Sequence, residues 1–231
     1  MRILCIAEGA SVVARVAEML RAGGWNVQLL SQDEQPLQRS FSSEPCVIVI
    51  DAAHSSESVV ELCRRVRVCF AKSALVIFTR QYAGPVAIAA LEAGADQLVP
   101  SSCEADDLLA TIRAILRRSP PPDSWPDGSS ASMRKLAAPS VTVTNPQIEL
   151  TRLETRIIRQ LGTDPGHVTP VRDLCTRVWG VDRAYERRAL YVHIRNIRVK
   201  LGPNAWRLQT VRGRGYRLLS AAHGQSGRAG Y

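Results

Sequence analysis

The chain has 231 residues, a length that suits one large domain or two ordinary ones. Its formal net charge of +9 is uneven, because residues 140–231 hold 16 Lys and Arg against 6 Asp and Glu. No run of about 18 apolar residues predicts a transmembrane helix, and the short apolar start before Glu8 does not suit a signal peptide. The basic C-terminal part suits a polyanion such as nucleic acid, and no free amphipathic helix supports a membrane surface instead.

Residues 1–118 alternate between short apolar runs and helical patterns. The apolar runs cover 2–6, 27–30, 46–50, 74–79 and 97–99, and the helical patterns cover 11–22, 58–69, 86–92 and 106–118. This alternation predicts a doubly wound α/β domain, in which five parallel strands carry helices on both faces and any site lies at the carboxyl ends of the strands. Asp51 follows an apolar run directly, so we expect its carboxylate at that edge.

Six cysteines are spread over the chain without CxxC pairs and without ligand-like spacing to histidine. They are Cys5, Cys46, Cys63, Cys69, Cys103 and Cys175. This usage predicts small core residues of a reduced, cytoplasmic protein. A redox-sensing cysteine stays open as an alternative, which would require an exposed thiol with a low pKa.

Residues 119–139 are rich in Pro, Ser, Gly and Asp, and they are predicted to form an extended linker. The alternating apolar residues of 140–150 predict short strands that open a second domain, which we place at 140–220. Residues 221–231 are predicted to be a disordered tail.

Two helices are expected next. Thr151 and Glu154 form a capping-box pattern at the start of a helix that runs to Leu161. A second helix follows Thr169-Pro170 and ends at Trp179, and residues 182–187 are then expected to be a loop.

The stretch from Arg187 to Arg217 combines a cationic helix with a cationic hairpin. Apolar residues of one helical stripe recur at spacings of four, three and four, at Leu190, Ile194, Ile197 and Leu201. Strand-like residues around Gly213 and Gly215 predict a tight hairpin. Such a helix fits the major groove of a duplex, and an arginine on a narrow hairpin reaches the minor groove. An ordinary amphipathic helix with a solvated basic face is the alternative.

The joint pattern closely resembles the winged helix-turn-helix domain of OmpR/PhoB-type response regulators. The matching residues are Arg188, Val192-His193-Ile194, Arg198, Lys200-Leu201-Gly202, Thr210-Val211-Arg212-Gly213 and Gly215-Tyr216-Arg217, with Trp179-Gly180 closing the preceding helix. The resemblance implies a sequence-specific transcription factor that binds double-stranded DNA.

The candidate DNA-binding residues lie on this helix and hairpin. They are Arg188, Tyr191, Val192, His193, Arg195, Asn196, Arg198, Val199, Lys200, Arg212, Arg214 and Arg217. Arg195 and Asn196 suit guanine and adenine edges. His193 and Arg198 are expected at phosphates, with half-buried packing as the alternative for His193.

Within the hairpin, Arg214 is the candidate for the minor groove, while Arg212 and Arg217 are expected to brace phosphates or the wing itself. In the preceding loop, Tyr185 and Glu186 are candidates for contact with RNA polymerase or DNA.

Residues 1–118 are similar to the receiver domain of the same regulators, on the stretches Ala90–Asp96 and Leu108–Arg118. The resemblance implies Asp51 as phosphoacceptor and Thr79 as the residue that contacts the phosphoryl group. The chain departs from the family where two acidic residues should hold Mg²⁺, since it has Ala7 and Glu8 there. Ser101 stands in place of the expected lysine, Ser102 in place of the proline that follows it, and Leu98 in place of the switch aromatic residue.

Phosphoryl transfer to a carboxylate needs a divalent cation and a cationic side chain, so these losses predict weak Mg²⁺ binding and a poorly stabilised acyl phosphate. We therefore expect a receiver-like domain that acts independently of phosphorylation, with Asp51 as a solvated or capping carboxylate and no resident cofactor. Two alternatives remain: phosphorylation of Asp51 by a sensor kinase, with Glu8 and Asp51 as a weak metal site, and a small ligand in the vacated pocket.

The resemblance also implies a homodimer through the helix before the fifth strand, that strand and the last helix. The candidate dimer residues are Ala87, Leu91, Asp96, Asp107, Thr111 and Arg118. Residues 86–91 are apolar, which favours a constitutive hydrophobic contact. Two subunits would read half-sites about one helical turn apart. The sequence shows no spacing typical of a nucleophile and its base and no cluster of metal ligands, so we do not expect an enzyme.

Overall fold

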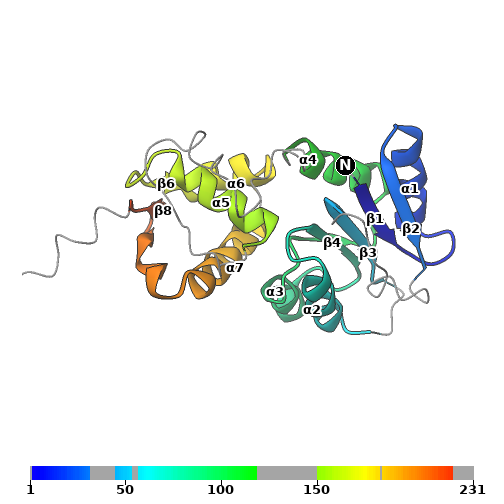
Figure 1. Cartoon of the computed structure of the whole chain (residues 1–231), viewed down its shortest axis with the longest axis horizontal. Coiled ribbons are helices and arrows are strands. Elements are labelled where there is room, and N and C mark those ends of the chain that lie inside the picture. The colour runs from blue at the N-terminus through cyan, green and yellow to red at the C-terminus, as the bar shows by residue number, and fades with distance from the viewer. Residues whose placement is uncertain (1, 32–44, 54–56, 119–149, 183, 221–231) are drawn as a thin grey trace, which may run out of the picture. The chain divides into compact units, whose positions relative to one another are not determined.

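The computed structural model describes residues 2–31, 45–53, 57–118, 150–182 and 184–220 (Figure 1). The chain divides into two compact units, Met1–Ser124 and Trp125–Tyr231. The boundary between them falls inside the predicted linker. That linker, the tail and nearly all of the predicted strands in 140–150 lie outside the described residues.

The N-terminal unit contains a parallel sheet flanked by helices. Its strands are β1 (Arg2–Ile6), β2 (Asn26–Leu30), β3 (Val47–Asp51), β4 (Ala74–Thr79) and β5 (Gln97–Pro100). Within the described residues they pair in the order β2-β1-β3-β4-β5, and every pair is parallel. The helices are α1 (Val12–Ala22), α2 (Val59–Cys69), α3 (Gly84–Glu92) and α4 (Ala105–Arg118). This confirms the predicted doubly wound fold.

The sheet is buried because helices cover both of its faces (Figure 1). Helices α1 and α4 pack on one face, where Val16, Leu20 and Ile112 meet the strand residues Val49 and Val76. The side chains of a strand alternate between faces, so the other face buries the intervening residues beneath α2 and α3. All residues of β3 and β4 are buried, as their continuous apolar runs predicted.

Arg67 and Asp96 form a buried pair at the amino ends of β4 and β5. Arg67 Nη2 donates to Asp96 Oδ2 at 2.6 Å, and the Leu75 amide donates to the same oxygen at 2.8 Å. Arg67 also donates to the carbonyl oxygens of Gly94 and Ser73. Asp96 is only 4% exposed, so the prediction that it joins a dimer face is wrong.

The C-terminal unit is a winged helix-turn-helix. Its elements are α5 (Arg152–Gly162), β6 (Thr169–Pro170), α6 (Val171–Trp179), α7 (Ala184–Leu201), a 3₁₀ turn η5 (Gly202–Arg207), β7 (Leu208–Val211) and β8 (Gly215–Leu218). The strands form an antiparallel sheet in the order β6-β8-β7, in which β7 and β8 are the wing. Ile157, Leu174, Ile194 and Leu218 bring α5, α6, α7 and the sheet into one core.

Two local predictions can be compared directly with this unit. Thr151 and Glu154 form the expected capping box, because each side chain accepts from the backbone of the other residue. The expected loop over 182–187 is shorter than predicted, since α7 already begins at Ala184. Glu186 is therefore in the first helical turn and is 6% exposed, which removes it as a surface contact.

Candidate nucleic-acid interface

One side of α7 presents a stripe of exposed side chains. Arg188, Tyr191, Arg195 and Val199 follow one another at spacings of three and four residues, and all four are exposed. Tyr191 and Val199 expose 55% and 73% of their surface, which is unusual for large hydrophobic residues. Asn196 lies beside this stripe and is half-buried. These five predicted residues therefore share the outer part of the helix.

Two further predicted residues of α7 face the inside of the unit. Val192 is 8% exposed and His193 is 2% exposed. The His193 ring packs near Trp179 of α6, with 6.2 Å between the ring centroids. The prediction that Val192 faces the DNA groove is wrong, and His193 is a packed residue rather than an exposed phosphate contact.

An ion pair joins Lys200, whose side chain is 33% exposed, to α5. Its Nζ lies 2.6 Å from Oε2 of Glu154, whose side chain is 1% exposed. The same carboxylate oxygen accepts from the Thr151 amide at 2.8 Å. The ammonium charge of Lys200 offsets that of the buried carboxylate, so the structure gives this predicted DNA-binding residue a partner within the unit.

Arg198 and Arg217 both contact the wing. Arg198 donates from Nε and Nη2 to the Leu208 carbonyl at 3.0 and 2.9 Å, and from Nη2 to Thr210 Oγ1 at 2.7 Å. Arg217 Nε donates to Gln209 Oε1 on the neighbouring strand at 2.9 Å. Arg198, which was expected at a phosphate, instead makes its hydrogen bonds within the unit. Arg217 braces the wing, which is one of the two roles predicted for it.

The wing tip carries two exposed arginines, Arg212 and Arg214. The turn closes where the Arg214 amide donates to the Val211 carbonyl at 3.0 Å. Gly215 is required next to it, because its φ is +156° and an added Cβ would lie 2.0 Å from the Thr169 carbonyl oxygen. The tight turn leaves the two arginines at the tip of the β7–β8 hairpin, and Gly215 allows β6 to pair closely with β8.

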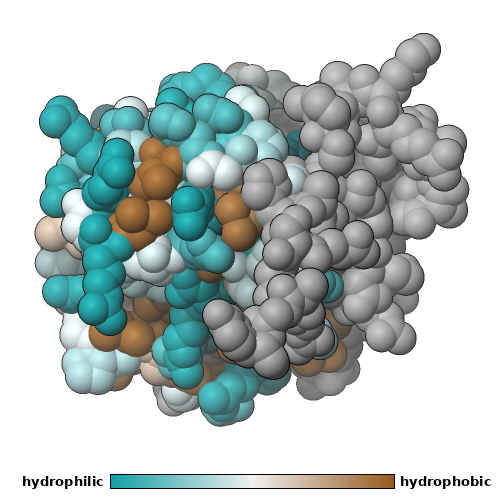
Figure 2. Space-filling view, turned by 90° about the vertical axis from the view of Figure 1, so that its left-hand side faces the viewer, coloured by the Kyte–Doolittle hydropathy of each residue, from teal (hydrophilic) through white to brown (hydrophobic). Residues whose placement is uncertain are grey.

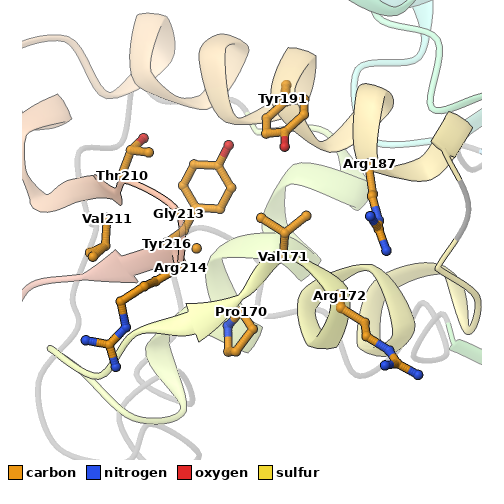
Figure 3. Close-up of a pocket in the computed structure, with 11 residues that line it drawn as sticks. Pro170, Val171, Arg172, Arg187, Tyr191, Thr210, Val211, Gly213, Arg214 and Tyr216 are labelled. Carbon is orange, nitrogen blue, oxygen red and sulfur yellow. The ribbon is translucent and has the colours of Figure 1, made fainter.

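A groove separates α7 from the wing (Figure 3). Pro170 and Val171 form part of its lining, together with Tyr191, Thr210 and Tyr216. In Figure 3 the Tyr191 hydroxyl points away from its helix into the groove, and the Tyr216 hydroxyl points toward α7. The groove is thus lined by hydroxyl groups and apolar side chains in its middle.

Arginines lie at both ends of this groove (Figure 3). Arg214 stands at the wing end, and Arg172 of α6 and Arg187 of α7 stand at the opposite end. Sequence reasoning did not select Arg172 or Arg187 as site residues. No signal in the sequence marks Arg172, because it belongs to a different helix and only the fold brings it to the groove.

Asp182 orders the arginines at that end. Its carboxylate accepts two hydrogen bonds from the Arg187 guanidinium and lies 4.0 Å from Arg172 Nε. The hydrogen bond from Arg187 lowers the pKa of the Asp182 carboxyl, and the same contact raises the pKa of Arg187. Both guanidinium groups therefore lie beside the same carboxylate at this end of the groove.

The surface of this unit is mixed in character (Figure 2). On the part of the visible face that is not drawn in grey, hydrophobic residues form small groups separated by long hydrophilic side chains.

Comparison with known proteins assigns this architecture to a family. Residues 145–218 match the family "Transcriptional regulatory protein, C terminal". The response regulator MprA of Mycobacterium sp. (strain KMS) is 30% identical over 223 residues, which cover 94% of this chain and 96% of that protein. The chain belongs to the OmpR/PhoB type of response regulators.

Other relatives agree with this assignment. The response regulator ArlR of Staphylococcus aureus (strain Mu50 / ATCC 700699) is 31% identical over 216 residues, covering 92% of this chain and 97% of that protein. A solved structure of a RitR variant has 18% sequence identity and a TM-score of 0.67, covering 95% of this chain and 99% of that one, and it shares the fold. This response regulator thus carries a DNA-binding transcriptional regulatory domain at its C-terminal end. In the described part of the chain, no helix is long and apolar enough to cross a membrane.

In the N-terminal unit of this response regulator, Asp51 is closed off from solvent. It is 2% exposed, and its Oδ1 accepts from the Ala53 amide at 3.0 Å. Thr79, on the neighbouring strand, is also 2% exposed, and its Oγ1 accepts from the Gln81 amide at 3.1 Å. Of the two roles expected for Asp51, the capping carboxylate fits and the solvated one does not.

The surroundings of Asp51 offer few groups to a cation. Ala7 is buried, and Glu8 is an exposed residue just beyond β1. Among the described residues no cluster of three or more His, Cys, Asp or Glu side chains is placed to hold a metal ion. Ser101, in place of the family lysine, uses its amide to donate to the Thr79 carbonyl at 2.9 Å.

The predicted dimer residues of this response regulator divide between its interior and its surface. Ala87 and Leu91 are 4% and 1% exposed and pack inside the unit, so they cannot form the outer face as predicted. Asp107 is exposed and Thr111 is half-buried, with its hydroxyl donating to the Asp107 carbonyl. The side chain of Arg118 lies outside the described residues.

The cysteines divide in the same way. Cys5, Cys46, Cys63 and Cys175 are buried, as predicted, whereas Cys69 is exposed and Cys103 is half-buried. Burial raises the pKa of Cys5 and of Cys63 to about 12, and that of Cys175 to about 11. Burial is also the main cause that raises the pKa of Cys103. These thiols are therefore poor nucleophiles.

Proposed function

We propose that this response regulator binds double-stranded DNA with α7 in the major groove and the β7–β8 wing in the adjacent minor groove, and that it controls transcription in the cytoplasm. The observation that carries the proposal is the cationic groove between α7 and the wing. If α7 lies in one DNA groove and the wing in the next, the phosphate strand between those DNA grooves must pass between α7 and the wing. The groove on the protein has arginines at both ends and hydroxyl groups between them.

The exposed residues suit distinct roles on the duplex. Arg195 and Asn196 would read base edges, Arg188 lies on the same exposed side, and Arg214 would enter the minor groove. Arg172, whose side chain is 80% exposed, would contact the phosphate strand, which adds one residue to the predicted set, while the Asp182 carboxylate already accepts two hydrogen bonds from Arg187. Val192, His193 and Lys200 would serve the interface only by holding α7 in the core.

The test is selection of duplexes from a random library, followed by anisotropy titration. Arg195→Ala should weaken binding by about 1–3 kcal/mol and relax the preference at one base pair. Arg172→Ala should weaken all sequences equally and reduce the salt dependence by roughly one ion. Arg113→Ala, an exposed arginine of α4, is the matched control and should change neither property. If no duplex is enriched, the proposal fails.

We also infer that the receiver-like unit acts without aspartyl phosphorylation. Asp51 is buried and accepts from its own loop, while Glu8 alone replaces the usual acidic pair. DNA affinity should therefore be the same with and without beryllofluoride, and in the Asp51→Ala variant. Tightening by beryllofluoride that Asp51→Ala abolishes would instead support a phosphorylated regulator with a sensor kinase.

The second alternative, a ligand in the receiver-like unit, has a separate readout. Thermal stabilisation by a small molecule without Mg²⁺ would support it.

We propose further that the protein forms a homodimer through α3, β5 and α4. The supporting residues on α3 are the half-buried Val86, Ile88 and Ala89, and those on α4 are Asp107 and Thr111. Sedimentation without DNA should give a dimer at micromolar concentration, and Ile88→Asp should give monomers. A monomeric wild type would contradict this proposal and leave DNA binding untouched. RNA polymerase is a further expected partner, with Tyr185 as the remaining candidate contact.

A further inference from the structure

Tyr191 and Arg198 lie seven residues apart on α7. Seven residues make about two helical turns, so the two side chains leave the helix on the same side. Both side chains reach the wing, and each contacts a different strand of it. These contacts make a connection between the helix and the hairpin at two separate points.

The first point joins α7 to β7. Arg198 donates twice to the Leu208 carbonyl and once to Thr210 Oγ1, at distances of 2.7 to 3.0 Å. A guanidinium group is planar and rigid, so this three-bond contact fixes the direction as well as the distance of the strand. A lysine has the same charge but cannot reproduce the fork.

The second point joins α7 to β8. The rings of Tyr191 and Tyr216 meet edge to face, with centroids 6.5 Å apart and an interplanar angle of 61°. Tyr216 is paired across the hairpin with Thr210, the residue whose hydroxyl Arg198 contacts. Both contacts therefore converge on one cross-strand pair. Thr210 lies four residues before Arg214, and Tyr216 lies two residues after it.

We propose that Arg198 is a positioning residue for DNA binding: together with Tyr191 it sets the angle of the wing to α7, so that Arg214 reaches the minor groove while Arg195 lies in the major groove. The inference rests on the proposed function. It assigns to Arg198 a role in geometry rather than a bond to phosphate.

A double-mutant cycle between Arg198 and Arg214 separates these roles. In the wild-type background Arg214→Ala should weaken duplex binding roughly tenfold. Arg198→Lys keeps the charge and loses the fork, so it should cost a similar factor. In the Arg198→Lys background, Arg214→Ala should cost less than about twofold, because the wing arginine is already misplaced.

Two controls use the same helix and the same duplex. Arg195→Ala should weaken binding by the same factor in both backgrounds, because the major-groove contact does not depend on the wing. Arg188→Lys repeats the conservative change on an exposed arginine of α7, and it should leave the full cost of Arg214→Ala intact.

A second variant keeps the proposal testable if Arg198→Lys fails to fold. Thr210→Val removes one acceptor of Arg198 without changing any charge, and it should reduce the cost of Arg214→Ala. Thr210→Ser should restore that cost.

Wild-type affinity of Arg198→Lys, with the full cost of Arg214→Ala retained, would overturn the proposal. A second result would also overturn it: Arg198→Ala weakens binding and lowers the salt dependence by one ion, while Arg214→Ala still costs roughly tenfold in that background. That is the behaviour of a phosphate contact. A wild-type protein that binds no duplex would instead refute the proposed function itself.

Discussion

Lys200 and Glu154 are 46 residues apart in the chain, yet the lysine Nζ lies 2.6 Å from a glutamate oxygen that is almost fully buried. The pair joins the C-terminal end of α7 to the first turn of α5. Because Glu154 also caps its own helix, one carboxylate stabilises both elements. Removal of the lysine would leave that charge buried with less compensation.

We therefore expect Lys200→Ala to destabilise the C-terminal unit by about 3 kcal/mol, at the lower end of the range for a broken buried pair because the lysine itself is one-third exposed. Urea unfolding of the full chain measures the change. Arg188→Ala, on the exposed side of the same helix, should stay within about 0.5 kcal/mol of wild type. A comparable loss in both variants would show that the ion pair is not the cause.

Gly215 should tolerate no side chain. Its φ of +156° and the 2.0 Å approach of a Cβ to the Thr169 carbonyl oxygen both oppose Gly215→Ala. We expect loss of the β6–β8 pairing, with a lower thermal midpoint and weaker DNA binding. Gly213→Ala, whose Cβ would meet nothing within 4 Å at a φ of +69°, should cost only about 1–2 kcal/mol. Equal midpoints for the two variants would contradict the steric argument.

In the N-terminal unit, Arg67→Ala should cost about 3–5 kcal/mol, because Asp96 would be left as a buried charge and several carbonyl groups would lose their donor. Chemical unfolding monitored in that unit checks this. Arg64→Ala removes an exposed ion pair with Glu61 on the same helix, so it should change stability by less than about 1 kcal/mol. A small effect of Arg67→Ala would mean that water replaces the guanidinium without penalty.

Thiol reactivity should follow burial. Cys69 is exposed and should react first with a disulfide reagent in the native protein. Burial raises the pKa of Cys5 and Cys63 to about 12, so their thiolate fraction stays small even at about pH 9 and they should react only after unfolding. Cys69→Ser should remove the fast phase. Fast modification of a buried cysteine below the unfolding temperature would point to local opening instead.

Much of this architecture was predictable because it depends on local patterns. The apolar runs of β3 and β4 and the stripe through Leu190 and Ile194 have the periods of a buried strand and an amphipathic helix, and they form those elements. The Thr151 capping box is likewise local, since its two partners are three residues apart. The exposed stripe from Arg188 to Val199 follows from the same helical period.

The roles of individual side chains were decided by contacts between distant residues. Periodicity marks one buried stripe on α7, but Val192 and His193 lie off it and are buried as well, because α7 is covered on more than one side. A sequence shows that Arg198, Lys200 and Asp96 are charged. It does not show that Arg198 donates to a carbonyl of the wing or that Lys200 pairs with a glutamate 46 residues away. Nor does it show that Asp96 pairs with an arginine 29 residues away.

The sequence by itself therefore determined the order of elements, the family and the cationic side of the C-terminal unit, since each depends on residue type and spacing along the chain. Only the tertiary structure decided which cations face outward and which stabilise the fold. The physical reason is that a charge becomes structural when packing places an acceptor beside it and removes water, and packing joins segments that are far apart in the sequence.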